Sequence, residues 1–140
     1  MIPSILIIDD SEDDILLTQM VLAKIGLKVR TESALSGEAG LAHLRDESRL
    51  PSLVLLDLKM PGMDGLDVLR TIRSDERLRR IPVIIVTHSD LESDREACRN
   101  LGASSFLRKS VDLDRFAEEL RKELETWMSS PAQQRAPYDK

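Results

Sequence analysis

Three carboxylates of this sequence stand where two short apolar runs end. Residues 5–8 form one run, which ends at Asp9 and Asp10, and residues 53–56 form another, which ends at Asp57. Such runs, closed by turn residues, are typical of strands buried on both faces of a sheet. If the two strands are neighbours, their carboxylates share one pocket, repel one another and need a cation. Carboxylate oxygens suit Mg²⁺, and an aspartate beside Mg²⁺ can attack phosphorus and form an aspartyl phosphate.

Two further polar residues follow later apolar runs. Thr87 follows residues 82–86, and Lys109 comes shortly after residues 105–107. In a parallel sheet the C-terminal ends of all these strands lie at one edge, where open α/β sheets bind ligands. The Lys109 ammonium can neutralise phosphoryl oxygens, and the Thr87 hydroxyl can donate a hydrogen bond to one of them. Each residue alone could be a cap, a turn residue or a solvated surface group, but together they predict a phosphoryl-transfer site.

The elements that must position these residues alternate between strands and helices. Ser11 is the predicted N-cap of the first helix, and Gly26 is its predicted C-terminal stop. The alternation predicts an α/β protein with a doubly wound, five-stranded parallel sheet of the (βα)5 type and helices on both faces. We expect strands at residues 5–8, 27–34, 53–56, 82–86 and 105–107, and helices at residues 15–25, 36–45, 66–73, 90–100 and 113–127.

Composition limits the classes of function. The 140 residues suffice for one domain, which we place at residues 1–128, with a flexible tail at residues 129–140. The net charge of −5 argues against a nucleic-acid-binding surface. No apolar run is long enough to span a membrane, and the single cysteine, Cys98, excludes an internal disulfide. We therefore expect a cytoplasmic protein.

Four motifs, in order along the chain, carry a resemblance to a known family. They are ILIIDDS at residues 5–11, LVLLDLKMPGMDG at 53–65, IPVIIVT at 81–87 and GASSFLRK at 102–109. Over residues 4–128 the chain resembles the receiver domain of two-component response regulators, which has a flavodoxin-like fold. No output domain follows in this sequence, so we expect the single-domain class. Segments 78–83 and 106–116 are similar to those of regulators paired with phytochrome-type histidine kinases.

The resemblance implies a role for each residue of the site. Asp57 would accept a phosphoryl group from the phosphohistidine of a sensor histidine kinase, and Lys109 would pair with that group. Mg²⁺ would be bound directly by Asp10 and Asp57 and largely through water by Asp9, and the backbone carbonyl of Lys59 would complete the protein ligands. The protein would catalyse only its own phosphorylation and dephosphorylation, so we expect a signalling switch and not an enzyme.

The resemblance also implies how phosphorylation would change the surface that a partner recognises. Thr87 would move toward the phosphoryl group, and Phe106 would reorient with it. The surface formed by the fourth helix, the fifth strand and the fifth helix would change, and a downstream protein partner would recognise it.

Three positions near the site are unusual. Ser110 stands where the family usually has a proline, so the loop that carries Lys109 lacks that constraint. His88 stands beside Thr87 where a small residue is usual, and its bulk would narrow access to the site. Lys59 lies two residues beyond Asp57, where a long side chain would shield an acyl phosphate from water. We therefore expect slow self-dephosphorylation.

Two other functions stay open on the sequence alone. One is a degenerate receiver that acts as a phosphate-independent interaction module, although the complete residue set argues against it. The other is a phosphatase with an aspartate nucleophile, which would need a second aspartate where Lys59 stands. A homodimer is a further possibility, with a seam of Leu120, Leu124 and Trp127 on the last helix.

Overall fold

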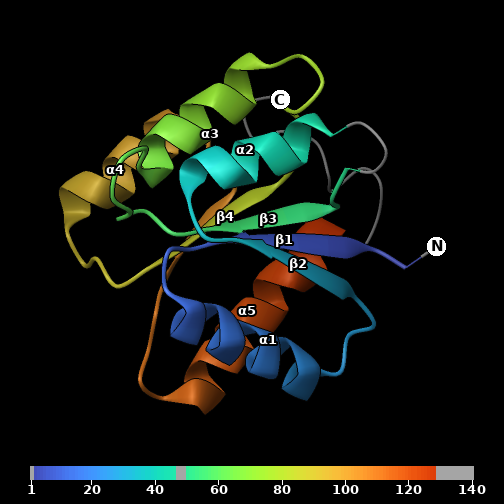
Figure 1. Ribbon diagram of the computed structural model, residues 1–140. Coiled ribbons are helices and arrows are strands. Elements are labelled where there is room, and N and C mark those ends of the chain that lie inside the picture. The colour runs from blue at the N-terminus through green and yellow to red at the C-terminus, as the bar shows by residue number, and fades with distance from the viewer. Residues whose placement is uncertain (1, 47–49, 129–140) are drawn as a thin grey trace.

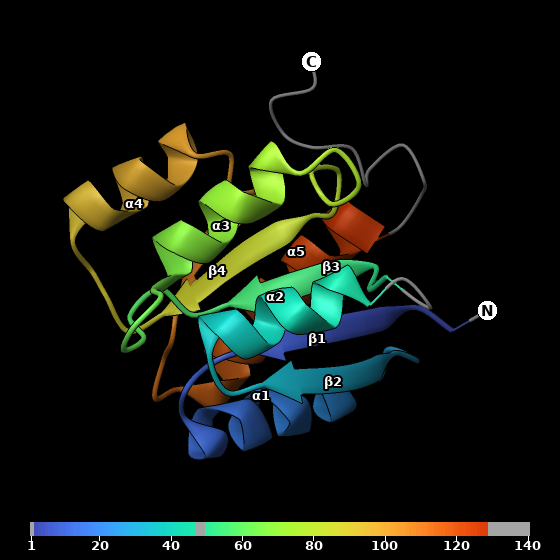
Figure 2. The same ribbon diagram turned by 45° about the horizontal axis from the view of Figure 1, so that its top comes forward.

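A five-stranded parallel sheet forms the centre of the protein. The computed structural model describes residues 2–46 and 50–128. The strands lie in the order β2-β1-β3-β4-β5, and all neighbouring pairs are parallel (Figure 2). This order confirms the predicted doubly wound (βα)5 sheet. The strands are β1 (Ser4–Ile8), β2 (Arg30–Ala34), β3 (Leu53–Leu56), β4 (Val83–Thr87) and β5 (Ser105–Arg108).

Helices cover both faces of the sheet. α1 and α5 lie on one face, and α2, α3 and α4 lie on the other (Figure 1). Each face buries its own apolar cluster, because successive side chains of the central strands point to opposite sides. No helix in the described part of the chain is long and apolar enough to cross a membrane. The helices are α1 (Glu12–Ile25), α2 (Gly37–Arg45), α3 (Gly65–Ser74), α4 (Glu92–Asn100) and α5 (Leu113–Met128).

The predicted N-cap and C-terminal stop of α1 are confirmed, although the helix begins at Glu12 and not at residue 15. The Ser11 side chain caps the helix by accepting a hydrogen bond from the Asp14 backbone N–H at 3.1 Å. The helix stops at Gly26, which has a φ of 86°, a left-handed conformation that glycine adopts without a Cβ clash. Because α1 starts so soon after β1, its first turn lies directly beside the carboxyl edge of the sheet.

Several element boundaries differ from the sequence prediction, and hydrogen bonds explain two of the differences. β2 begins at Arg30 and not at residue 27, because its first ladder bond runs from the Arg30 N–H to the carbonyl of Pro3. α4 begins at Glu92 and not at residue 90, because the Ser89 hydroxyl accepts a hydrogen bond from the Leu91 N–H and forms a turn there.

The predicted dimer seam on α5 is wrong for two of its three residues. Leu120 and Leu124 are 0% and 1% exposed and belong to the core between α5 and the sheet. Trp127 is half-buried and packs against the same core. The apolar stripe of α5 is therefore used within the protomer. The predicted tail at residues 129–140 lies outside the described residues.

Gly65 permits a close approach of α3 to the end of β3. A Cβ added at Gly65 would lie 2.3 Å from the carbonyl oxygen of Asp57 and 2.7 Å from the Cα of Leu58. Both are backbone atoms that cannot move aside cheaply. Gly65→Ala is expected to lower the free energy of unfolding by roughly 2–3 kcal/mol.

Gly26→Ala is the matched control for this prediction in denaturant unfolding. Nothing lies within 4 Å of a Cβ at Gly26, so only the left-handed backbone is penalised, by about 1 kcal/mol. Equal costs for the two variants would contradict the steric account of Gly65.

Candidate functional site

The sheet brings the three predicted carboxylates together. β1 and β3 are neighbours in register, with Ile8 opposite Leu56, so the residues that follow them meet at one edge. Asp9, Asp10 and Asp57 each offer a carboxylate oxygen, and these oxygens lie within 4.8 Å of one another. The side chains of Asp9 and Asp57 are buried, and that of Asp10 is exposed.

Asp57 is held rigidly at the end of β3. Its N–H donates to the Ile8 carbonyl at 2.9 Å. Its Oδ1 accepts a hydrogen bond from the Leu58 N–H at 2.8 Å. Burial raises the pKa of Asp57 to about 6; the Lys109 ammonium opposes this shift, and the negative charge of Asp9 adds to it.

Lys109 supplies the positive charge at the centre of the cluster. Its backbone N–H donates to the Thr87 carbonyl at 2.7 Å, which fixes the start of the loop after β5. Its Nζ lies 2.7 Å from Asp9 Oδ2 and 3.8 Å from Asp57 Oδ2, and the side chain is 9% exposed. Burial alone would lower the pKa of Lys109, but the hydrogen bonds to Asp14 and Asp9 outweigh it and raise that pKa.

Asp14 is a member of the cluster that was not among the site residues predicted from the sequence. Lys109 Nζ donates to Asp14 Oδ2 at 2.8 Å. Burial opposes ionisation of Asp14, but the Lys109 hydrogen bond and charge prevail and lower the pKa of Asp14. The available signal was its spacing from the Ser11 cap, which puts Asp14 on the side of the helix that faces the sheet edge.

His88 also reaches this group. Its Nε2 lies 3.3 Å from Asp14 Oδ2, and its side chain is 73% exposed. His88 therefore lies on the solvent side of the Lys109–Asp14 pair.

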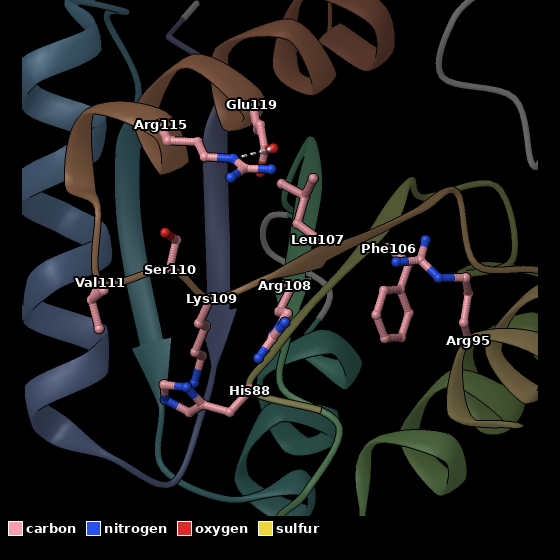
Figure 3. A pocket seen from close by; sticks show the side chains of 10 residues that line it. All are labelled: His88, Arg95, Phe106, Leu107, Arg108, Lys109, Ser110, Val111, Arg115 and Glu119. Atoms are coloured by element: carbon pink, nitrogen blue, oxygen red, sulfur yellow. Dashed lines mark hydrogen bonds and ion pairs between the residues drawn. The ribbon is translucent and has the colours of Figure 1, made fainter. Parts of the chain in front are cut away.

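Thr87 and Phe106 occupy neighbouring strands. Thr87 is 1% exposed, and its Oγ1 accepts a hydrogen bond from the Ser89 N–H at 3.3 Å. Phe106 is half-buried, and the guanidinium carbon of Arg95 lies 4.6 Å from the centre of its ring, a cation–π contact. Figure 3 shows Phe106 and Arg95 on one side of β5, away from Lys109 and His88.

A shallow pocket of about 620 Å³ lies on the face formed by α4, β5 and α5 (Figure 3). Charged side chains dominate its lining, and several are paired: Arg108 with Asp90 at 3.6 Å, and Arg115 with Glu119 at 3.4 Å. The surface predicted to signal is therefore a charged one.

Lys59 and Ser110 make contacts that were not predicted from the sequence. The Lys59 Nζ lies 3.2 Å from Asp94 Oδ2, so the side chain bridges the loop after β3 to α4. Asp94 also accepts a hydrogen bond from the Ser89 hydroxyl at 2.5 Å.

The peptide bond before Ser110 is trans, and no cis bond occurs in the described ranges. The Ser110 hydroxyl accepts a hydrogen bond from the Asp112 N–H at 3.0 Å.

The fold and this acidic edge define a class of protein. The family model for the response regulator receiver domain matches residues 5–121. The chain belongs to that family, whose members are signalling domains of two-component systems.

Individual relatives and solved structures are similar to most of the chain. The polar-differentiation response regulator DivK of Brucella ovis is 32% identical over 122 residues, covering 86% of this chain and 95% of DivK. The phosphorylated cyanobacterial phytochrome response regulator RcpA has a TM-score of 0.83 at 30% identity, covering 92% of this chain and 96% of RcpA. The Mn²⁺-bound response regulator Rcp1 has a TM-score of 0.80 at 32% identity, covering 91% of this chain and 96% of Rcp1. Both structural neighbours are thus response regulators, and RcpA is named as that of a cyanobacterial phytochrome.

The raised pKa of Asp57 predicts that the free energy of unfolding depends on pH. Its folded-state pKa of about 6 exceeds the usual 3.8, so the folded protein binds this proton more tightly than the unfolded chain does. Stability therefore falls as pH rises from about 4 to about 6, and the whole cost is present above that range. In metal-free buffer at pH 7, Asp57→Asn is expected to raise the free energy of unfolding by about 2–3 kcal/mol.

Denaturant unfolding in the presence of a chelator measures this gain. The gain should shrink toward pH 4.5, and the exposed control Asp13→Asn should show none. A destabilised Asp57→Asn protein at pH 7 would contradict the conclusion that burial makes the charged form of Asp57 unfavourable.

Proposed function

We propose that this protein is a phosphoryl-accepting signalling switch, with Asp57 as the phosphoacceptor. The observation that carries the proposal is the position of Asp57, which is buried at a strand end and lies 3.8 Å from the Lys109 ammonium. Asp9 and Asp10 stand within 4.8 Å of it. We assign this function to a receiver domain of residues 1–128.

The chemistry is a transfer between two nucleophiles. A carboxylate oxygen of Asp57 attacks the phosphorus of a phosphohistidine. An O–P bond forms as the P–N bond breaks, and the electron pair leaves with the imidazole nitrogen, which takes up a proton. Lys109 offers its ammonium to the phosphoryl oxygens, and the Thr87 hydroxyl, released from the Ser89 N–H, donates to one of them. Hydrolysis later returns the Asp57 carboxylate and inorganic phosphate.

The donor set fits a divalent cation. Oxygen ligands from Asp9, Asp10 and Asp57 suit Mg²⁺, which receiver domains bind at an acidic pocket. The backbone carbonyl of Lys59 would complete the protein ligands. When bound, Mg²⁺ would supply positive charge to the transferred phosphoryl oxygens. The Mn²⁺-bound form of Rcp1, a relative with the same fold, supports this assignment.

A sensor histidine kinase is the proposed donor. The likeness to RcpA and Rcp1 supports a phytochrome-type kinase, which would place the exchange in the cytoplasm. Movement of Thr87 toward the phosphoryl group and of Phe106 away from Arg95 would alter the charged face of α4, β5 and α5. A downstream protein partner would bind that face. The two alternative functions have weaker support. A phosphate-independent interaction module would not need this set of site residues. A phosphatase would need an aspartate at position 59, but that position is a lysine, which forms an ion pair with Asp94.

Phosphorylation by a small donor tests the proposal. Incubation of the wild-type protein with Mg²⁺ and acetyl phosphate or phosphoramidate is expected to add one phosphoryl group, measured by intact mass. Asp57→Asn should abolish the gain, and Asp13→Asn, an exposed carboxylate nearby, should retain it. An unchanged gain in Asp57→Asn, or none in the wild type, would refute the proposal. Sustained turnover of a phosphate monoester would favour the phosphatase.

The lifetime of the phosphorylated form tests the shielding role of Lys59. Lys59→Ala removes a long side chain from the mouth of the site and is expected to speed loss of phosphate about threefold, because water gains access. Lys59→Met keeps the length without the charge and should preserve most of the lifetime. Decay followed by intact mass after removal of the donor gives both rates. Equal lifetimes for Lys59→Ala and the wild type would contradict the idea.

A further inference from the structure

We propose that Asp14 is a positioning residue for phosphoryl transfer: together with Asp9 it fixes the Lys109 ammonium so that its remaining N–H faces the phosphoacceptor. The inference rests on the proposed function of Asp57. It adds a residue of α1 to a site otherwise built from strand ends. Asp14 acts through Lys109 and touches neither the reacting atoms nor the proposed metal ligands.

The geometry of the ammonium carries the argument. An ammonium has three N–H donors. Two are taken by short contacts from Lys109 Nζ, 2.7 Å to Asp9 Oδ2 and 2.8 Å to Asp14 Oδ2. Asp57 Oδ2, at 3.8 Å, is too far for a hydrogen bond but near enough to feel the charge. The third donor is therefore left for a phosphoryl oxygen carried by Asp57.

Burial makes these contacts decisive. The Lys109 side chain is 9% exposed and that of Asp14 is 23% exposed, so water competes weakly for either group. A flexible lysine has many rotamers, and two anchoring carboxylates select one of them. The anchor also joins α1 to the loop after β5, two segments separated by 95 residues in sequence. This loop carries Ser110 and lacks the constraint that a proline would impose.

Helix geometry singles out Asp14 among the acidic residues of the first turn. Glu12, Asp13 and Asp14 all favour the helix N-terminus through the helix dipole. Glu12 and Asp13 are exposed, and only Asp14 turns inward. Asp13 is thus a matched control, because Asp13→Asn removes the same charge from the same turn without touching Lys109.

Loss of the Asp14 carboxylate has two expected consequences. Lys109 keeps Asp9 but loses its second anchor, so the donor is misplaced, and phosphorylation by a small donor slows about tenfold. The donor concentration that gives half of the maximal rate changes little, because Asp14 acts on Lys109 and not on the donor. A purely structural role of Asp14 would not depend on whether residue 14 carries a carboxylate.

The experiment compares phosphorylation rates of the 140-residue chain at neutral pH over a series of phosphoramidate concentrations. Phosphoramidate with saturating Mg²⁺ is the probe, and the maximal rate and the half-saturating donor concentration of each variant are compared with those of the wild type. The variants are Asp14→Asn, Asp14→Glu and Asp13→Asn, with thermal melts to verify folding. Asp14→Glu retains a carboxylate and should recover most of the wild-type maximal rate.

The outcomes separate the inference from the function on which it rests. A lower maximal rate for Asp14→Asn at an unchanged half-saturating donor concentration, beside normal Asp13→Asn and Asp14→Glu proteins, is the expected result. Equal maximal rates for Asp14→Asn and Asp13→Asn, or an Asp14→Glu protein as slow as Asp14→Asn, would overturn the positioning role. Failure of the wild type to be phosphorylated would instead overturn the proposed function.

Discussion

The site depends on one electrostatic constraint, the repulsion among carboxylates crowded at the carboxyl edge of the sheet. Asp9 and Asp57 are buried and face one another across neighbouring strands, and Asp14 adds a third negative charge from α1. One buried ammonium, that of Lys109, touches two of them and lies 3.8 Å from the other. Burial raises the pKa of Asp57 to about 6, because the single ammonium offsets only part of the cost of keeping this carboxylate charged, and the charge of Asp9 adds to the cost. A divalent cation would supply the missing positive charge.

The fold creates this constraint through parallel strands and short connections. Parallel pairing of β1 with β3 puts three carboxylates at one edge, and the ladder from β4 to β5 delivers Thr87 and Lys109 to the same edge. The close packing of Gly65 against the backbone of Asp57 fixes the end of β3. Two contacts connect the surroundings of the site to α4. The Lys59–Asp94 ion pair links the loop after β3 to α4, and Arg95 of α4 packs over the ring of Phe106 in β5. A change at Asp57 thus has packed neighbours through which to reach the charged face of α4, β5 and α5.

The strand order and the cluster of Asp9, Asp10 and Asp57 were predictable, because apolar runs that end at acids locate strand ends and the topology of such sheets is restricted. Asp14 was not recognised as part of the cluster, since an acid in a first helical turn has a sufficient local reason to be there. The Lys59–Asp94 pair joins residues 35 apart and has no local signature. The α5 seam was misjudged because an apolar stripe does not say which partner covers it; Leu120 and Leu124 pack on the sheet.

The central claim is that Asp57, and no other carboxylate of the cluster, forms the acyl phosphate. Borohydride reduces an acyl phosphate to an alcohol, so it converts a phosphorylated aspartate to homoserine and releases the phosphoryl group. Reduction of the phosphorylated wild-type protein, followed by peptide mapping, therefore identifies the modified residue directly. The account predicts homoserine at position 57 alone, in an amount equal to the phosphoryl group incorporated. Homoserine at Asp9, Asp10 or Asp14, or none at position 57, would contradict it.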